Sequence, residues 1–396
     1  MRKKMFIFLA VILAFDVFAV GLAFFTRNSS RPDIDAQLPE NNTSEAAEPF
    51  SRVSVVAVGD NLIHDTIYEQ AAARSSSGYD FSIAYEKIAD RIGKADLAIL
   101  NQETIISTEH NVSSYPQFNS PTEVGDEMIK IGFDVFNIST NHSLDCGEKG
   151  LISAINFWKT KGKLTTGAYL NAQEADKIVT NEINGIKFAY LGFTESTNGL
   201  SLPDDSEVIL VHASDEQFLM QKIQRAKKEA DVVIVNAHWG VEYTHEPSDE
   251  QKALAEKLAL WGADIIIGTH PHVIQPVEYI ENEDGRKTLV AYSLGNFISA
   301  QNRGARMLGG MLNFDVVKNN TTGKISLENV KFDGTVTHYG QNCSNVRVYP
   351  LADYTAELAD SHGVKSKTPD FSLKYIYDIL DEVIDEQFLD KTQRKG

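Results

Sequence analysis

The chain has 396 residues, of which 42% are hydrophobic and 23% are charged, a composition typical of globular proteins with a buried core. Its formal net charge of −18 argues against nucleic acid or anionic lipid as a partner, because phosphate groups require clustered lysine and arginine. A phosphorylated substrate is not excluded, since a bound metal ion can supply positive charge. Two cysteines, Cys146 and Cys343, are too few for a disulfide scaffold or a thiolate metal site, and whether they pair is left open.

Residues 1–25 have the pattern of a transmembrane anchor or a signal peptide. Basic residues at positions 2–4 precede an apolar stretch from Met5 to Phe25, interrupted by Asp16 and long enough to span a bilayer. The basic residues favour a cytoplasmic N-terminus, so the rest of the chain is expected outside the cytoplasmic membrane. We favour an uncleaved single-pass anchor in the cell membrane because the stretch is long for a signal peptide. The alternative is secretion after cleavage near residues 21–23.

The rest of the chain divides into three segments. Residues 26–50, rich in Asn, Ser, Pro and Glu, predict a flexible linker. Residues 51–350 predict the main folded domain, and residues 351–396 a helical tail. Within the tail, the amphipathic stretch from Leu373 to Leu389 predicts a helix that docks on the domain or on a partner.

Apolar runs alternate with helical patterns along the main domain. Strands are expected at 53–58, 97–100, 135–138, 187–193, 232–235, 265–267, 289–294, 311–317 and 325–330. Helices are expected at 81–94, 122–132, 149–161, 214–230 and 249–261. Such alternation predicts an α/β fold with a largely parallel sheet and helices on its faces. The continuous apolar character of the strands agrees with burial on both faces.

Potential metal ligands follow five of these apolar strands. They are Asp60, Glu103, Asn141, His238 and the pair His270 and His272. Each has an ordinary structural explanation, such as a turn, a helix cap or a core histidine, and only the recurrence favours a common site. In open α/β sheets, bound small molecules and ions lie at the carboxyl ends of the strands. These residues would meet there.

The mixture of carboxylate, amide and imidazole ligands suits Mn, Fe or Zn. Six protein ligands exceed the needs of one tetrahedral ion. We therefore expect one or two divalent metal ions, with two ions sharing a bridging carboxylate as the simplest arrangement. Two such ions can clamp the oxygens of a phosphoryl displacement and lower the pKa of a bound water.

Six motifs occur in a specific order over roughly residues 52–318. They are GDNLIHD at 59–65, NQET at 101–104, STNHSLDCGEKGL at 139–151, NAHWGVEY at 236–243, GADIIIGTHPHVIQPVE at 262–278 and YSLGNFI at 292–298. The series resembles the poly-γ-glutamate capsule biosynthesis proteins of the CapA type, distant relatives of the calcineurin-like metallophosphoesterases. The resemblance implies a four-layer α/β/β/α sandwich with a metal site at the strand ends.

The resemblance also implies roles for single residues. Asp60 is similar to the first-strand ligand, Glu103 stands where a bridging aspartate is usual, and Asn141 is similar to the amide ligand of an Asn-His motif. His142 is similar to the acid that protonates the leaving group. The imidazole ligands of the family correspond to His238, His270 and His272.

Three neighbouring positions leave alternatives open. Asp145 either orients His142 or caps a helix. The wider superfamily has a histidine two residues after Asp60, where this chain has Leu62. His64 lies nearby in a different register and is a ligand, an acid or a bystander.

Two functions follow from these expectations. The first is a membrane-anchored extracytoplasmic hydrolase that uses divalent metal ions on a phosphorylated substrate or an anionic polymer such as poly-γ-glutamate. In that function, metal-activated water attacks and His142 acts as general acid. The second is a non-catalytic accessory subunit of a membrane polymer synthase or export complex, which keeps the site for binding.

Overall fold

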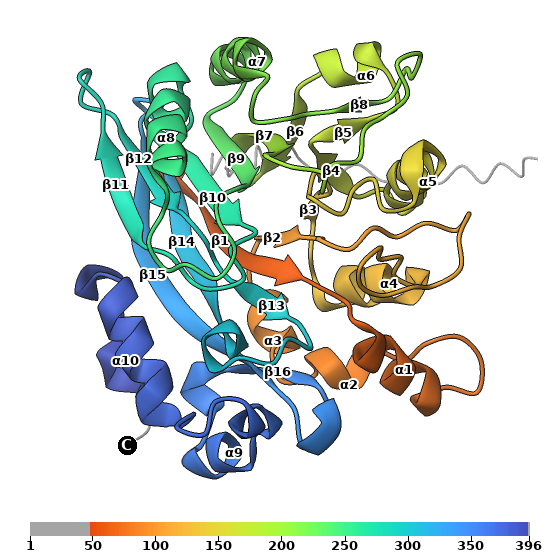
Figure 1. Cartoon of the computed structure of the whole chain (residues 1–396). Coiled ribbons are helices and arrows are strands. Elements are labelled where there is room, and N and C mark those ends of the chain that lie inside the picture. Colours follow the sequence, from red (N-terminus) through yellow and green to blue (C-terminus); the bar gives the residue numbers. More distant parts are fainter. Residues whose placement is uncertain (1–47, 395–396) are drawn as a thin grey trace, which may run out of the picture. The chain divides into compact units, whose positions relative to one another are not determined.

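The computed structural model describes residues 48–394 (Figure 1). The expected anchor and nearly all of the expected linker fall within residues 1–47 and therefore lie outside the described residues. Between residues 48 and 394, no helix is both long and apolar enough to cross a membrane. The membrane anchor therefore stays a prediction from the sequence.

Two large sheets form the centre of the described region. In the first, the strand order is β16 (Arg347–Pro350), β15 (Ile325–His338), β14 (Leu308–Asn319), β1 (Phe50–Asn61), β2 (Leu97–Asn101), β3 (Val135–Asn137) and β4 (Leu164–Thr166). A short strand, β13 (Asn296–Ile298), pairs with the end of β1. The β1 to β4 stretch is parallel, whereas β14, β15 and β16 are antiparallel. The expectation of a largely parallel sheet therefore holds for the β1 to β4 side of this sheet and is wrong for the β14 to β16 side.

The second sheet is arranged differently, with a parallel centre and an antiparallel strand at each edge. Its strand order is β11 (Val277–Glu281), β12 (Lys287–Ala291), β10 (Ile265–Thr269), β9 (Val232–His238), β7 (Ile186–Thr194) and β6 (Val179–Ile183). Only β6 and β11, at the two edges, are antiparallel to their neighbours. A separate small pair joins β5 (Ala168–Tyr169) to β8 (Ile209–Leu210).

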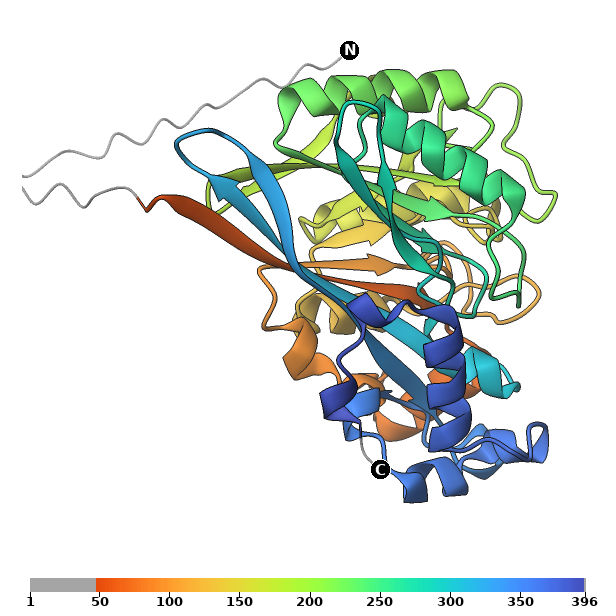
Figure 2. The ribbon, with the colours of Figure 1, turned by 90° about the vertical axis from the view of Figure 1, so that its left-hand side faces the viewer.

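Side chains on β9 divide between two cores. Because successive side chains of a strand face opposite sides, Val232 and Ile234 point one way and Val233 and Val235 the other. The first pair belongs to the hydrophobic core that also contains β1 and β2, and the second to a core that contains residues of α7 (Glu216–Glu229) and α8 (Asp249–Trp261). The two sheets therefore share one core, and α7 and α8 cover the outer face of the second sheet (Figure 2).

Helices α4 (Thr122–Ile131) and α5 (Gly147–Thr160) pack against the first sheet. The Trp158 ring of α5 stacks on Phe136 of β3 with ring centroids 3.9 Å apart, and Met128 of α4 lies in the same core. Together with the sheet order, these contacts confirm the α/β class predicted from the sequence.

The remaining helices show where the sequence prediction was incomplete. They are α1 (Asp65–Arg74), α2 (Ser82–Tyr85), α3 (Ala89–Ile92), α6 (Ala172–Asp176), α9 (Ala356–Ser361) and α10 (Leu373–Val383). The helix expected at 81–94 is divided into α2 and α3, because bonds such as Ile88 N to Tyr85 O span three residues and tighten the chain between them. Its apolar positions are nevertheless buried at helical spacing.

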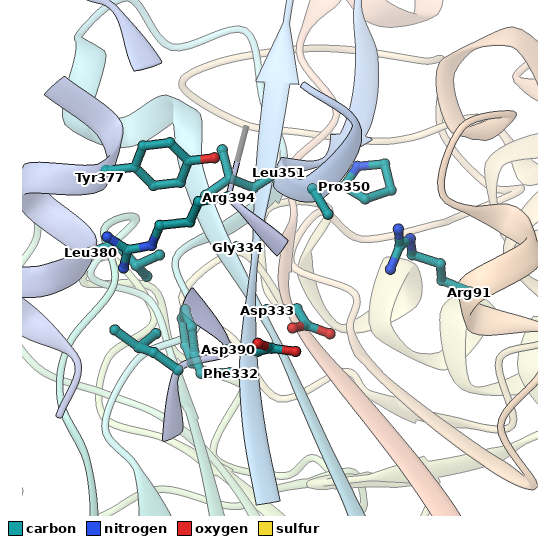
Figure 3. A pocket seen from close by; sticks show the side chains of 12 residues that line it. Arg91, Phe332, Asp333, Gly334, Pro350, Leu351, Tyr377, Leu380, Asp390 and Arg394 are labelled. Carbon is teal, nitrogen blue, oxygen red and sulfur yellow. The ribbon is translucent and has the colours of Figure 1, made fainter. Parts of the chain in front are cut away.

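The C-terminal tail packs on its own domain. Leu373, Ile376 and Leu380 of α10 belong to the main core. Of the two expected docking sites, the helix therefore uses its own domain. The helix ends at Val383, earlier than expected, and a small cavity lies between α10 and β15 (Figure 3).

Both cysteines, Cys146 and Cys343, have free thiols. The disulfide that the sequence left open is therefore not formed.

Candidate metal centre

The six predicted ligands lie at strand ends that face one another. The set comprises Asp60 in β1, Glu103 after β2, Asn141 after β3, His238 at the end of β9, and His270 and His272 after β10. The first three come from the eight-stranded sheet and the others from the six-stranded sheet. All are buried except His270, which is partly exposed. The site thus forms where the carboxyl ends of two parallel stretches meet.

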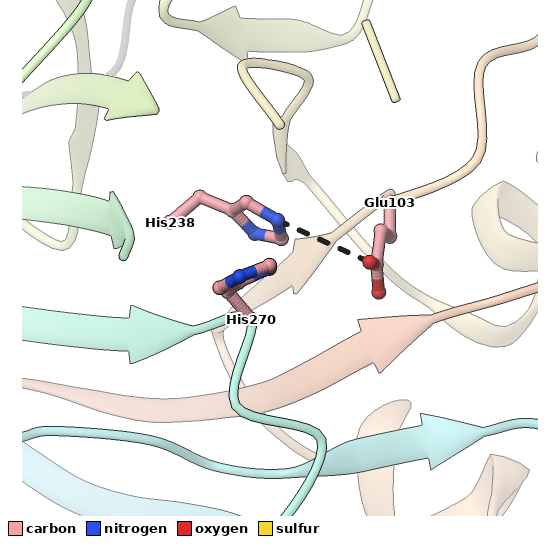
Figure 4. A group of neighbouring side chains, drawn as sticks. All are labelled: Glu103, His238 and His270. Atoms are coloured by element: carbon pink, nitrogen blue, oxygen red, sulfur yellow. Dashed lines mark ion pairs between the residues drawn. The ribbon is translucent and has the colours of Figure 1, made fainter. Parts of the chain in front are cut away.

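Glu103 lies between two sets of ligand atoms. One set is Glu103 with His238 and His270 (Figure 4), and the other is Glu103 with Asp60 and His272. Within each set the ligand atoms are within 4.8 Å of one another. Glu103 Oε1 is 4.0 Å from His238 Nε2 and 3.6 Å from His272 Nε2. Glu103 thus belongs to both sets and lies between them, at the position where the resemblance implies a bridging carboxylate.

Polar atoms at this centre have no protein partner. Within residues 48–394, both carboxylate oxygens of Glu103 and Nδ1 of His270 are buried without a hydrogen bond. Burying polar atoms unpaired is costly, and buried charges are normally paired or coordinate metals. These atoms therefore fit a site for divalent cations better than a structural polar cluster.

His238 is held by polar neighbours at both ring nitrogens. Its Nδ1 is 3.0 Å from Thr269 Oγ1 and 3.3 Å from Asn101 Nδ2, and its Nε2 is 2.9 Å from Asn141 Oδ1. A metal on Nε2 requires the ring proton on Nδ1, where Thr269 Oγ1 can accept it. Asn141 Oδ1 then lies beside the same ion, as expected for an amide ligand.

The two ring nitrogens of His272 have different surroundings. Nε2 faces Glu103, and Nδ1 lies next to polar side chains that hold the ring in place. Nδ1 is 3.1 Å from Asp60 Oδ2 and 3.1 Å from Asn296 Oδ1. Burial lowers the pKa of His272, but the carboxylates of Glu103 and Asp60 together act more strongly and raise it to about 9. The negative charge that attracts this proton would equally attract a metal cation.

The other charges of the cluster are also tuned by burial. Burial, helped by the charge of Asp60, raises the pKa of Glu103 well above its usual range although His272 opposes the shift. Burial, and then the neighbouring imidazoles, lower the pKa of His238 well below its usual range and that of His270 to about 4. Two neutral imidazoles keep their lone pairs, which is the form that binds metal.

Backbone strain accompanies the last two ligands. His270 and His272 have φ angles of 100° and 59°, on either side of Pro271. Such conformations cost about 1–3 kcal/mol each and cluster at functional sites. The backbone N–H of His270 points at the carboxylate of Asp60, 3.3 Å from both oxygens. The strained turn thus places the His272 imidazole and the backbone N–H of His270 against the same carboxylate, Asp60.

His142 forms a pair with Asp145 beside the ligand cluster. Its Nδ1 is 2.7 Å from Asp145 Oδ2, which also accepts a hydrogen bond from the backbone N–H of Phe118. The cap of α5 is Cys146, without a side-chain bond, so Asp145 is not the helix cap. Within the described residues no protein atom hydrogen-bonds Nε2 of His142. The pair therefore fixes Nδ1 and leaves Nε2 for another group.

His64 takes no part in the metal-ligand groups of the described residues. Its Nδ1 is 3.2 Å from both Leu62 O and Ala300 N, at the start of α1. Leu62 itself is buried in the core. Leu62 therefore supplies no metal ligand next to Asp60. His64 does not take over that role, because its ring lies outside the groups of ligand atoms in the described residues.

Several supporting residues were missed by sequence reasoning. They are Asn101, Thr269, Asn296 and Glu242. Asn101 donates to Asp60 Oδ1 at 2.8 Å, and Asn296 lies opposite Asp60 where β13 pairs with β1. Asn296 and Glu242 are part of the quoted YSLGNFI and NAHWGVEY motifs. The polar character of these two residues within largely apolar motifs was the feature of the sequence that could have indicated a role at the site.

Residues 54–301 match the family model described as "Bacterial capsule synthesis protein PGA_cap". The chain is 33% identical over 201 residues to the PGA biosynthesis protein CapA of Bacillus subtilis (strain 168), covering 49% of this chain and 51% of that protein. It is 36% identical over 174 residues to the capsule biosynthesis protein CapA of Bacillus anthracis, covering 43% and 41%. The chain matches about half the length of these curated relatives, or less.

Matches among solved structures include two bacterial proteins. The calcineurin-like phosphoesterase YfkN from Bacillus subtilis is 15% identical, with a TM-score of 0.43 over 83% of this chain and 100% of that chain. A putative 5'-nucleotidase from Staphylococcus aureus is 15% identical, with a TM-score of 0.44 over 81% and 58%.

Proposed function

Because the chain belongs to the bacterial capsule synthesis protein family PGA_cap, we propose that it acts in the biosynthesis or export of a capsule polymer. The names of its relatives make poly-γ-glutamate the leading polymer. The basic-apolar pattern of residues 1–25 supports placement as a single-pass membrane protein with its domain on the extracytoplasmic side. The helix and sheet contacts support the four-layer architecture implied by the motifs.

We further propose that the strand-end cluster is a hydrolytic site for a phosphoester or an activated polymer end. The observation that carries this proposal is Glu103, a buried carboxylate with two unpartnered oxygens between two sets of imidazole and carboxylate ligands. Asp60 and His272 would hold one divalent ion with Glu103, and Asn141, His238 and His270 the other. Ions bound there would polarise the substrate and activate water.

His142 has the geometry of a general acid in this reaction. Asp145 accepts from Nδ1–H, which fixes the ring orientation and leaves Nε2 free to give a proton to the leaving group when the ring is an imidazolium. Thr140 Oγ1 accepts from the backbone N–H of His142 at 3.2 Å and adds a second restraint. The ring edge also packs against Phe118, with ring centroids 4.7 Å apart.

The hydrolase proposal is tested with full-length protein, Mn²⁺ and bis-p-nitrophenyl phosphate. His142→Ala is expected to lower kcat at least about 100-fold, the contribution typical of a positioned acid. The ion content should stay unchanged, because none of the candidate ligand groups found within residues 48–394 contains His142. The matched control is His110→Ala, on an exposed loop. An ion-loaded wild type without turnover on phosphoesters or on capsule polymer, or full turnover in His142→Ala, would contradict hydrolysis.

A non-catalytic accessory role is favoured by one observation, the apolar Leu62 beside Asp60. In that role the protein binds metal and an anionic polymer within a synthase or export complex. Ion binding without turnover, together with capsule loss in Glu103→Gln and normal capsule in His142→Ala, would support the accessory role over hydrolysis.

A further inference from the structure

An ion held by Asp60, Glu103 and His272 would lack a protein ligand from position 62, where the resemblance implies a histidine and this chain has Leu62. Leu62 is only 2% exposed and its backbone N–H is bonded to Ile298 O, so this residue belongs to the core. A neighbouring ion could draw on Glu103, Asn141, His238 and His270. One position would therefore have three protein ligands where its neighbour would have four.

Glu242 lies beside this incomplete position. It sits in the loop between β9 and α8, and its Oε1 is 4.0 Å from His272 Nε2. With His270 and His272 it forms the third group of ligand atoms within 4.8 Å of one another. Its side chain is 41% exposed, so the carboxylate can move toward an ion from the solvent side.

The Glu242 loop is fixed to the histidine turn by its backbone. Tyr243 N donates to Pro271 O at 2.7 Å, which joins the residue after Glu242 to the residue between the two histidines. Tyr243 has a φ of 69°, an unfavourable conformation for a residue other than glycine. Gly240, with a φ of 91°, has no room for a Cβ, which would lie 2.4 Å from the Gln251 side chain. The loop is thus held in one particular path over the site.

Ring contacts also hold the residue next to Glu242 against the site. The Tyr243 ring lies beside the His272 ring, with ring centroids 5.9 Å apart. The guanidinium of Arg306 stacks over the Tyr243 ring, 3.4 Å from its centroid. These contacts keep the loop that carries Glu242 next to His272.

We infer that Glu242 supplies the ligand that Leu62 does not, and completes the ion position formed by Asp60, Glu103 and His272. This inference rests on the metal site of the proposed function. The resulting set has three carboxylates and one imidazole, whereas the neighbouring set has three imidazole or amide ligands and one carboxylate. Oxygen-rich sets suit Mn²⁺ and nitrogen-rich sets suit Zn²⁺, so the Glu242 position is selective for Mn²⁺.

The test compares Mn²⁺ and Zn²⁺ binding to full-length wild type, Glu242→Gln and Glu246→Gln. Glu246 is the matched control because it lies on the same loop, is exposed and pairs with Lys252 instead of the site. Competition titration with a chelating dye and elemental analysis give affinity and ion count without an activity assay. We expect two ions in wild type and, in Glu242→Gln, about 10- to 100-fold weaker Mn²⁺ binding at one position only.

A second variant separates the ligand role from a loop effect. Glu242→His should keep both ions bound but shift the weakened position from Mn²⁺ toward Zn²⁺. Unchanged Mn²⁺ affinity in Glu242→Gln, with two ions still bound, would overturn the inference while leaving the proposed metal site intact. No ion bound to wild type would instead overturn the metal site itself. An equal loss in Glu246→Gln would also refute a specific role for Glu242.

Discussion

Buried histidines occur in two places in the described domain, and their hydrogen bonds differ. At the strand ends, His270 Nδ1 and both oxygens of Glu103 have no protein partner. Near β16, His362 has both nitrogens satisfied: Nε2 lies 2.9 Å from Thr337 O and Nδ1 accepts from Val364 N at 3.0 Å. His338 beside it is bonded to Tyr354 Oη at 2.8 Å. Burial alone therefore does not distinguish the candidate site, whereas buried polar atoms without a hydrogen bond, at Glu103 and His270, do.

The largest effect that tests this contrast is expected from Glu103→Gln. Removing the shared charge should weaken divalent-ion binding at least about 1000-fold, equivalent to about 4 kcal/mol. His362→Gln should leave ion binding unchanged, because its partners are all protein atoms. Calorimetric titration of Mn²⁺ into both variants measures the difference. Similar ion binding in wild type and Glu103→Gln would remove the distinction between the two clusters.

The hydrogen-bonded cluster of His338 and His362 should instead affect how the free energy of unfolding changes with pH. Burial, more than the neighbouring His338 and against the bond to Thr337, lowers the pKa of His362 to about 4, compared with 6.5 in the unfolded chain. Between these values the unfolded chain binds more protons, so the free energy of unfolding falls as pH drops from 6.5 to 4 and then levels off. His362 contributes about 3 kcal/mol to this loss at most.

Urea unfolding between pH 7 and pH 4 measures that slope. His362→Gln should flatten it, and exposed His110→Gln should not. His338 lies in the same cluster, and its pKa is lowered to about 4 by burial and by the charge of Arg347, so part of the slope should remain. An unaltered slope in His362→Gln would contradict a buried neutral imidazole at this position.

A smaller effect is expected from the support of His272. Asn296→Ala removes the amide oxygen 3.1 Å from His272 Nδ1 and should weaken ion binding about 10-fold, the lower end of what outer-shell partners contribute. Asn313→Ala on β14 is the matched control, because Asn313 bonds Asp333 and Met311 away from the site. If both alanine variants bind Mn²⁺ equally well, Asn296 has no part in holding the ligand.

Much of the fold followed from apolar runs, and what was missed has a physical explanation. The central strands β1, β2, β9 and β10 are buried along most of their length, so they appear as continuous apolar stretches. The edge strand β6 has no buried residue and a polar centre, so it gives no such signal. Helix α1 buries only Ile67 and Ala71 and lacks a side-chain cap, which left it unpredicted.

The candidate site was predictable in its ligands but not in its supports. Strand-end positions indicated the six ligands because parallel strands gather their carboxyl ends. Asn296 and Glu242 come from a short strand and a loop whose positions depend on pairing between distant segments. Sequence spacing carries no information about that pairing. Sequence spacing also could not distinguish an Asp145 that contacts His142 from an Asp145 that caps the helix, because His142 and the start of the helix are both within a few residues of it.

The strained turn at His270 and His272 has an evolutionary consequence. Both positions have a left-handed backbone that glycine adopts freely and asparagine adopts more readily than most residues. If the site lost its purpose in some lineage, mutation would relieve this strain by replacing the imidazoles. Histidine retained at both positions across distant homologues would therefore record continuous selection for ligand chemistry, while glycine or asparagine there would mark descendants that have abandoned it.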